Sequence, residues 1–281
     1  MPAKPERAIG YTPASLAMAR AACLELATRL GDLLDDLVVV GGLVPSLLID
    51  QDVLHDGDDR HVGTLDVDVG LALGLLQKPR YEELHARLRA GGFGPDRNDQ
   101  GRPTAQRWRA GVSGPAVDFL IAPPSAIAEP GSLQHLEPDL AAIVTPGLDL
   151  AFRDASFVEL SGPTLSGGVA TRRIRACGAG AFLVLKALAF SSRGENKDAY
   201  DLYYLLRHFG GSVKDVADCV RPLLDSEHAR RAIEILRRDF GHGDALGPTR
   251  VAVFSGGAPD ANLQADVAGL VHALMNQLGV G

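Results

Sequence analysis

The stretch from Thr64 to Leu73 begins with a strict alternation of polar and apolar residues, and this pattern constrains the fold more than any other feature of the chain. The apolar members are Leu65, Val67 and Val69. In an extended strand, alternate side chains point to opposite faces, so Asp66 and Asp68 emerge together on the face away from the apolar set. The stretch therefore predicts a half-buried strand that displays two carboxylates.

A third carboxylate, Asp118, lies within the predicted strand Ala116–Ala122, which a glycine-containing turn joins to the predicted strand Thr104–Ala110. Three carboxylates on neighbouring strands supply the oxygen ligands that Mg²⁺ prefers. Two such ions would clamp a phosphoryl group and activate an attacking hydroxyl. The alternative is that the paired acids only mark a solvent-facing sheet edge.

A glycine pair follows the apolar run Leu37–Val40, which is typical of a buried strand. Gly41 and Gly42 lead into a short predicted helix over Leu43–Ile49. Backbone N–H groups at such a turn can approach phosphate oxygens closely, and the helix N-terminus adds positive potential. A tight strand-to-helix turn without a ligand explains the same residues.

A second group of charged residues occupies positions 186–204. Asp198 and Asp201 are three residues apart and so lie on one side of a predicted helix. Lys186 is surrounded in sequence by aliphatic residues, so its ammonium needs an anionic partner. That partner is either one of these carboxylates, which would pin two helices together, or a nucleotide phosphate. The two roles are compatible.

The chain has 281 residues and changes in character along its length. Mixed strand and helix patterns fill the first half, and a loop-rich zone covers residues 123–147. A further strand pair is expected over residues 152–160 and 169–176. Helical periodicity then continues to the end of the chain; the predicted helices cover 179–192, 196–208, 212–224, 226–239 and 261–278. We therefore expect an α+β protein with a core domain over residues 1–147 and a mainly helical domain over 148–281.

Charge is unevenly placed in this acidic chain, whose net charge is −7. Residues 1–70 carry five basic and twelve acidic side chains, whereas residues 171–197 carry six basic side chains and one acidic. An acidic segment suits metal ions and a basic segment suits polyphosphate, while the overall balance disfavours nonspecific nucleic-acid binding. Three scattered cysteines and no long apolar run predict a cytoplasmic protein without a membrane partner.

Taken together, these segments resemble the AbiEii/AbiGii family of toxin-like nucleotidyltransferases, within the polymerase-β-like nucleotidyltransferase superfamily. The resemblance extends from about residue 37 to 208 and is carried by Val38–Gly42, Gly63–Asp68, Val117–Leu120, and Lys186 with Arg193 and Lys197–Leu202. It implies the mixed sheet with flanking helices of that superfamily, followed by a helical domain that completes the nucleotide site.

The resemblance also implies roles for individual residues. The triphosphate would be cradled by Gly41 and Gly42 beside Thr64, and the metals, Mg²⁺ or Mn²⁺, would be bound by Asp66, Asp68 and Asp118. Asp118 would in addition help to deprotonate the acceptor hydroxyl. Charges on the nucleotide would be met by Lys186 and Arg193, with Asp198 and Asp201 positioning the lysine or the nucleotide.

The first hypothesis for function is therefore a metal-dependent nucleotidyltransferase that uses a nucleoside triphosphate. By family analogy the acceptor is RNA, for example the 3′ end of tRNA, the activity is that of a toxin, and a cognate antitoxin is a conceivable partner. A second hypothesis keeps the chemistry but takes a small-molecule acceptor, as antibiotic nucleotidyltransferases do. A third is a nucleotide-binding protein without turnover, because Leu43 stands where the family commonly has Ser or Thr.

Overall fold

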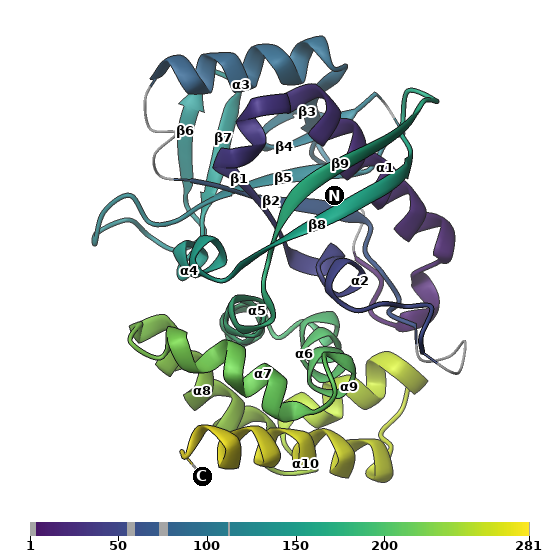
Figure 1. The fold of residues 1–281 in the computed structure, drawn as a ribbon, viewed down its shortest axis with the longest axis vertical. Coiled ribbons are helices and arrows are strands. Elements are labelled where there is room, and N and C mark those ends of the chain that lie inside the picture. The colour runs from purple at the N-terminus through teal and green to yellow at the C-terminus, as the bar shows by residue number, and fades with distance from the viewer. Residues whose placement is uncertain (1–3, 55–59, 73–77, 112, 281) are drawn as a thin grey trace. The chain divides into compact units, whose positions relative to one another are not determined.

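The computed structural model describes residues 4–54, 60–72, 78–111 and 113–280. The chain divides into two compact units. The colours of Figure 1 follow the residue number from purple at the N-terminus to yellow at the C-terminus. Unit 1 contains Pro13–Leu47 and Gly63–Cys177, and unit 2 contains Lys4–Thr12, Leu48–Val62 and Gly178–Gly281. A surface loop is expected from the sequence over residues 50–63, and its residues 55–59 lie outside the described residues. The same holds for Leu73, the last residue of the predicted strand 64–73.

Unit 1 is built on a mixed sheet of nine strands among the described residues. Its main path runs β3-β4-β5-β2-β1-β9-β8, and β7 pairs with both β5 and β6. The strands are β1 (Leu37–Val40), β2 (Asp66–Leu71), β3 (Phe93–Arg97), β4 (Pro103–Ala110), β5 (Ala116–Ile121), β6 (Leu133–Glu137), β7 (Leu140–Val144), β8 (Ala155–Pro163) and β9 (Val169–Cys177). The central strand β2 runs antiparallel to β1 and parallel to β5.

The two faces of this sheet differ because apolar and polar residues alternate along β2 and β5. The inner set on these strands belongs to the main hydrophobic core of unit 1 and comprises Val67, Val69, Leu71, Val117, Phe119 and Ile121. Helices α1 (Pro13–Leu30) and α3 (Lys78–Ala90) contribute to the same core and pack over that face (Figure 1). Asp66, Asp68 and Asp118 alternate with the inner set and therefore lie on the opposite face.

Two short helices lie beside the central strands, and the second of them lies on the aspartate-bearing face. Helix α2 (Pro45–Leu48) follows β1 after a turn of 3-10 helix over Gly41–Leu43. Helix α4 (Leu148–Arg153) contacts β1 and β9, and its first residue lies against Gly70 of β2. The aspartate-bearing face is thus apolar at one end of β2 and acidic at the other.

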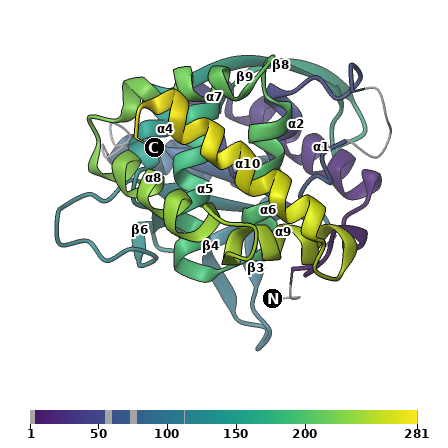
Figure 2. The ribbon, with the colours of Figure 1, turned by 90° about the horizontal axis from the view of Figure 1, so that it is seen from below.

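Unit 2 is helical among its described residues. Its helices are α5 (Ala179–Arg193), α6 (Asn196–His208), α7 (Val213–Val220), α8 (Glu227–Phe240), α9 (Leu246–Gly256) and α10 (Ala261–Leu278). The first two form a tight helical hairpin around Gly194, which closes α5 in the left-handed conformation. The last helix, α10, packs across α6, α7, α8 and α9 (Figure 2).

The α+β class predicted from the sequence agrees with this architecture, although the division of the chain falls elsewhere. The sequence suggests a core over 1–147 and a helical part over 148–281, whereas unit 1 continues to Cys177 and unit 2 takes in Lys4–Thr12 and Leu48–Val62 besides the residues from Gly178 onward. The cause of the first difference is β9, whose residue Ala176 pairs with Val39 of β1 and brings β8 into the sheet of unit 1. The loop-rich zone 123–147 also contains the strands β6 and β7.

Candidate functional site

Three aspartates gather on one face of the sheet of unit 1. Asp66 and Asp68 come from β2, and Asp118 comes from the parallel neighbour β5, where it stands in register with Asp68. Asp66 and Asp118 are buried, at 4% and 7% exposure, and Asp68 is partly exposed. Alternation along the strands places the three carboxylates on one face of the sheet, and the pairing of β2 with β5 makes them neighbours. A shared site requires both.

Arg107 of β4 holds this group of acids together. It stands directly opposite Asp118 across the antiparallel β4–β5 pair. Its Nε donates to Asp118 Oδ1 at 2.6 Å, while its Nη2 donates both to Asp118 Oδ2 and, at 3.1 Å, to Asp66 Oδ2. These bonds to Asp118, together with the charges of the three aspartates, raise the pKa of Arg107 despite its burial.

Thr64 and Gly41 shape the edges of the aspartate group. The Thr64 hydroxyl, which is buried, donates to Asp66 Oδ1 at 3.0 Å and so fixes that carboxylate. Gly41 has a φ of +70°, and a Cβ at this position would lie 1.9 Å from Asp68 Oδ2. The backbone at Gly41 can approach Asp68 only because glycine has no side chain. Gly42 is buried in the following turn.

The donor set of the aspartate group suits a hard divalent cation, because it consists of carboxylate oxygens from two adjacent strands. Among the described residues, however, no three His, Cys, Asp or Glu side chains stand ready to hold a metal ion. The guanidinium of Arg107 instead bonds two of the three candidate ligands. The chemistry of the residues fits Mg²⁺ or Mn²⁺, and a positive charge already sits among them.

Unit 2 contains the second predicted group, centred on Lys186. Its Nζ lies 2.9 Å from Asp198 Oδ1 and 2.7 Å from Asp201 Oδ2, linking α5 to α6. Arg193 adds two bonds to Asp198, at 2.6 and 2.8 Å. Burial opposes ionisation of Lys186, yet the two adjacent carboxylates outweigh it and raise its pKa. Lys186 thus joins α5 to α6 through these ion pairs, which is one of the two roles that the sequence leaves open for it.

Exposure separates the two cations of this group. The side chain of Lys186 is 9% exposed, whereas that of Arg193 is 51% exposed. The carboxylates of Asp198 and Asp201 are 1% and 0% exposed. Of the predicted nucleotide-contacting residues in unit 2, Arg193 is therefore the one that solvent and a phosphate can reach most easily.

The unit 2 group has two further members, His61, which the sequence does not connect to it, and Lys197, which belongs to the quoted motif but has no predicted role. His61 is fully buried, and its Nε2 lies 2.8 Å from Asp201 Oδ1. Lys197, one turn before Asp201, also pairs with that carboxylate. Burial and the charge of Lys197 lower the pKa of His61 to about 4, so the ring is neutral. Since an ionised carboxylate only accepts hydrogen bonds, Nε2 of the neutral ring donates to Asp201. Periodicity could not reveal this partner, which lies 140 residues away in the sequence.

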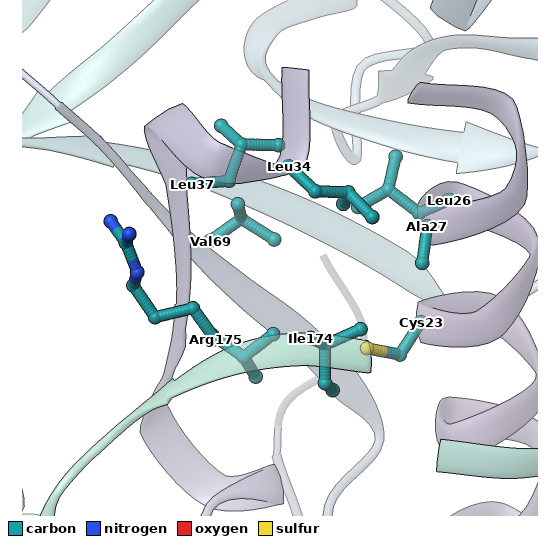
Figure 3. Close-up of a pocket in the computed structure, with 9 residues that line it drawn as sticks. Cys23, Leu26, Ala27, Leu34, Leu37, Val69, Ile174 and Arg175 are labelled. Carbon is teal, nitrogen blue, oxygen red and sulfur yellow. The ribbon is translucent and has the colours of Figure 1, made fainter. Parts of the chain in front are cut away.

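A small cavity in unit 1 lies away from this chemistry (Figure 3). It has a volume of about 20 Å³ and lies on the α1 side of the sheet, lined mainly by apolar side chains such as Cys23, Val39, Val69 and Ile174. Val69 alternates with Asp68 along β2, so the cavity and the carboxylates lie on opposite faces. Burial raises the pKa of Cys23 to about 12, which leaves an unreactive thiol there.

The comparisons with known proteins give one family. Residues 64–274 match the family model described as "Nucleotidyl transferase AbiEii toxin, Type IV TA system". The match covers Asp66, Asp68, Asp118 and the α5 and α6 residues of the Lys186 group, and it continues beyond residue 208 to most of the helices of unit 2. No curated protein matches the chain. None of the helices in the described parts of the chain has the length and apolar character of a membrane span.

Proposed function

The chain belongs to the AbiEii family of nucleotidyl transferase toxins of type IV toxin–antitoxin systems, and from this membership we propose that it transfers a nucleotidyl group from a nucleoside triphosphate to an acceptor hydroxyl. The observation that carries the proposal is the convergence of Asp66, Asp68 and Asp118 on one face of the sheet. We further propose that these three carboxylates hold Mg²⁺ or Mn²⁺.

In this reaction the acceptor oxygen forms a bond to the α-phosphorus, and the bond from that phosphorus to the pyrophosphate breaks. A divalent ion, when bound, supplies charge that stabilises the triphosphate and the developing alkoxide. Asp118 accepts the proton of the attacking hydroxyl, and Thr64 keeps Asp66 oriented. Gly41 and Gly42 leave room for backbone N–H groups to approach the phosphates.

For the charged group of unit 2 we propose different roles for Lys186 and Arg193. Lys186 is buried between two carboxylates and acts first as the link between α5 and α6. Arg193, which is half exposed, meets a phosphate of the nucleotide. Replacing Arg193 by Gln should then raise the KM for the nucleotide more than it lowers kcat, because it removes a binding contact.

We propose that the acceptor is RNA, with the 3′ end of tRNA as the first candidate. We also propose that the protein acts in the cytoplasm.

The experiment mixes the full-length protein with each α-labelled nucleoside triphosphate, total RNA and a small-molecule extract, with Mg²⁺ or with EDTA. Label in the tRNA band supports this acceptor, whereas label only in a small product favours the small-molecule alternative. Bound nucleotide without any transfer would make the chain a nucleotide-binding protein and overturn the proposal.

The variants for this experiment are Asp66→Asn and Asp68→Asn, with Asp35→Asn as control. Each variant removes one negative charge from unit 1, but Asp35 is exposed and lies outside the aspartate group. We expect losses of at least about a hundredfold in rate for the first two and activity near that of the wild type for the control. Growth arrest on expression that disappears with Asp66→Ala would support the toxin assignment.

A further inference from the structure

The two oxygens of Asp118 are both occupied by the fork of Arg107. Nε donates to Oδ1 at 2.6 Å, and Nη2 donates to Oδ2. The same Nη2 reaches Asp66 Oδ2 at 3.1 Å, while Thr64 takes the other oxygen of Asp66. A metal ion bound by these two aspartates needs at least one oxygen from each, and both oxygens of Asp118 and one of Asp66 already face the Arg107 guanidinium. The two cations therefore compete for the same carboxylate groups.

The position of Arg107 makes this competition specific. Its side chain is 12% exposed, and the side chains of Asp66 and Asp118 that it faces are 5% and 10% exposed when counted without their backbone atoms. Two buried carboxylates that are close enough to bond the same nitrogen of Arg107 repel each other unless a cation lies between them. Arg107 supplies a single positive charge, and a divalent ion would supply twice that. An arginine side chain is long enough to move away while its strand stays in the sheet.

We propose that Arg107 is the resident counter-cation of the aspartate group, and that it must release Asp66 and Asp118 before a divalent metal ion binds. The inference rests on the proposed function, because it assumes that the aspartates are metal ligands. Arg107 is in this sense a positioning residue: it keeps the metal-free carboxylates together and sets how strongly the metal is bound.

Strand β4 also provides a matched control. Arg109 lies two residues further along the strand and therefore on the same face. It forms an equivalent forked pair with Asp96, through Nε at 3.1 Å and Nη2 at 2.7 Å. Asp96 belongs to β3 and lies outside the aspartate group. Replacing either arginine by Met removes a partly buried forked ion pair, but only one replacement removes the proposed competitor.

The test is a titration of the full-length protein with Mn²⁺ alone, with free Mn²⁺ followed by electron paramagnetic resonance. Arg107→Met should bind Mn²⁺ at least about tenfold more tightly than the wild type, because no charged hydrogen bonds need to break. Arg109→Met should stay within about twofold of the wild type. Thermal unfolding gives a second readout: metal-free Arg107→Met should melt lower than the wild type and gain more from Mn²⁺.

Wild-type protein that binds Mn²⁺ as tightly as Arg107→Met, or more tightly, would overturn the inference and leave the proposed function standing. Absence of Mn²⁺ binding in both proteins would overturn the metal site itself and the inference with it. If Arg107→Met does not fold, Arg107→Lys keeps the charge but loses the fork, and about threefold tighter binding is expected. Unchanged binding in that variant would contradict the competition.

Discussion

Gly41 is the residue on which the shape of the aspartate site depends most directly. Its φ of +70° strains any other residue, and a Cβ would overlap the carboxylate of Asp68. Gly41→Ala should therefore lower the free energy of unfolding by roughly 2–3 kcal/mol and weaken Mn²⁺ binding by at least about tenfold. Chemical denaturation and the Mn²⁺ titration measure the two effects.

The control for this variant is Gly101→Ala. Gly101 has a similar φ of +74°, but nothing lies within 4 Å of the added Cβ. Its replacement should cost only the backbone strain, about 1 kcal/mol, and leave Mn²⁺ binding unchanged. Equal effects of the two variants on metal binding would show that the contact between Gly41 and Asp68 does not shape the site.

His61 gives unit 2 a specific response to acid. The folded pKa is about 4, below the ordinary value of 6.5. Between pH 6.5 and pH 4, His61 is protonated in the unfolded chain but stays neutral in the folded chain. Lowering the pH through this range therefore lowers the free energy of unfolding. The stabilisation from His61 is therefore fully present above about pH 6.5 and has declined by about 3 kcal/mol when the pH reaches 4.

The measurement compares the wild type with His61→Gln by urea unfolding, followed by far-UV circular dichroism, across this pH range. The groups around the imidazole are Asp201, Lys197, Lys186 and the rings of Tyr200 and Tyr204. Because Gln does not titrate, the stability difference between the two proteins should shrink as the pH falls. A difference that stays constant with pH would contradict a neutral buried imidazole.

Individual partners were the hardest features to predict from the sequence. The carboxylates of β2 follow from alternation, since Asp66 and Asp68 are separated by one apolar residue. Arg107 has no such signal, because its role depends on the antiparallel register that sets it opposite Asp118. Trp108 beside it is fully buried and donates its ring N–H to the Ala105 carbonyl.

At the scale of elements, the link between α5 and α6 depends on Lys186. Lys186→Met removes the one cation that the two buried carboxylates share, so Asp198 and Asp201 each lose a charged partner and are no longer linked through it. Breaking a buried pair from one side costs about 3–5 kcal/mol. We expect unit 2 to melt markedly lower in this variant, as measured by circular dichroism.

Lys214→Met is the matched control, because Lys214 pairs with Asp218 on an exposed face of α7. Exposed pairs of this kind contribute less than about 1 kcal/mol, so stability should hardly change. If Lys186→Met proves as stable as this control while nucleotide binding is lost, the lysine acts on phosphate and not as a link between helices.

Elements with a clear period were predictable, and those formed by tertiary pairing were not. The strand over Leu37–Val40 and the helix over residues 196–208 match their sequence patterns residue by residue. The strand β7, in contrast, lies in a zone rich in turn residues and forms because Leu120 and Ile121 of β5 pair with it. Helix α9 contains Pro248, two glycines and several β-branched residues, so local propensity disfavours it.

At the scale of the whole molecule, family membership and the carboxylate face support one account. The match over residues 64–274 gives the nucleotidyl transferase toxin class, and unit 1 brings together the three aspartates that we propose for this chemistry. The acceptor could not be predicted from fold or charge, because substrate choice depends on surfaces that a family of one fold varies freely. Labelled transfer to tRNA, in preference to a small molecule, is the expected outcome at this scale.

The central claim is that Asp66, Asp68 and Asp118 form a metal centre, and anomalous diffraction from crystals grown with Mn²⁺ and a non-hydrolysable nucleoside triphosphate tests it most directly. The account predicts an anomalous peak at about 2.1 Å from oxygens of these aspartates, with Arg107 no longer bonded to Asp118. A nucleotide-bound crystal with no peak there, and with Arg107 still joining Asp66 to Asp118, would contradict it.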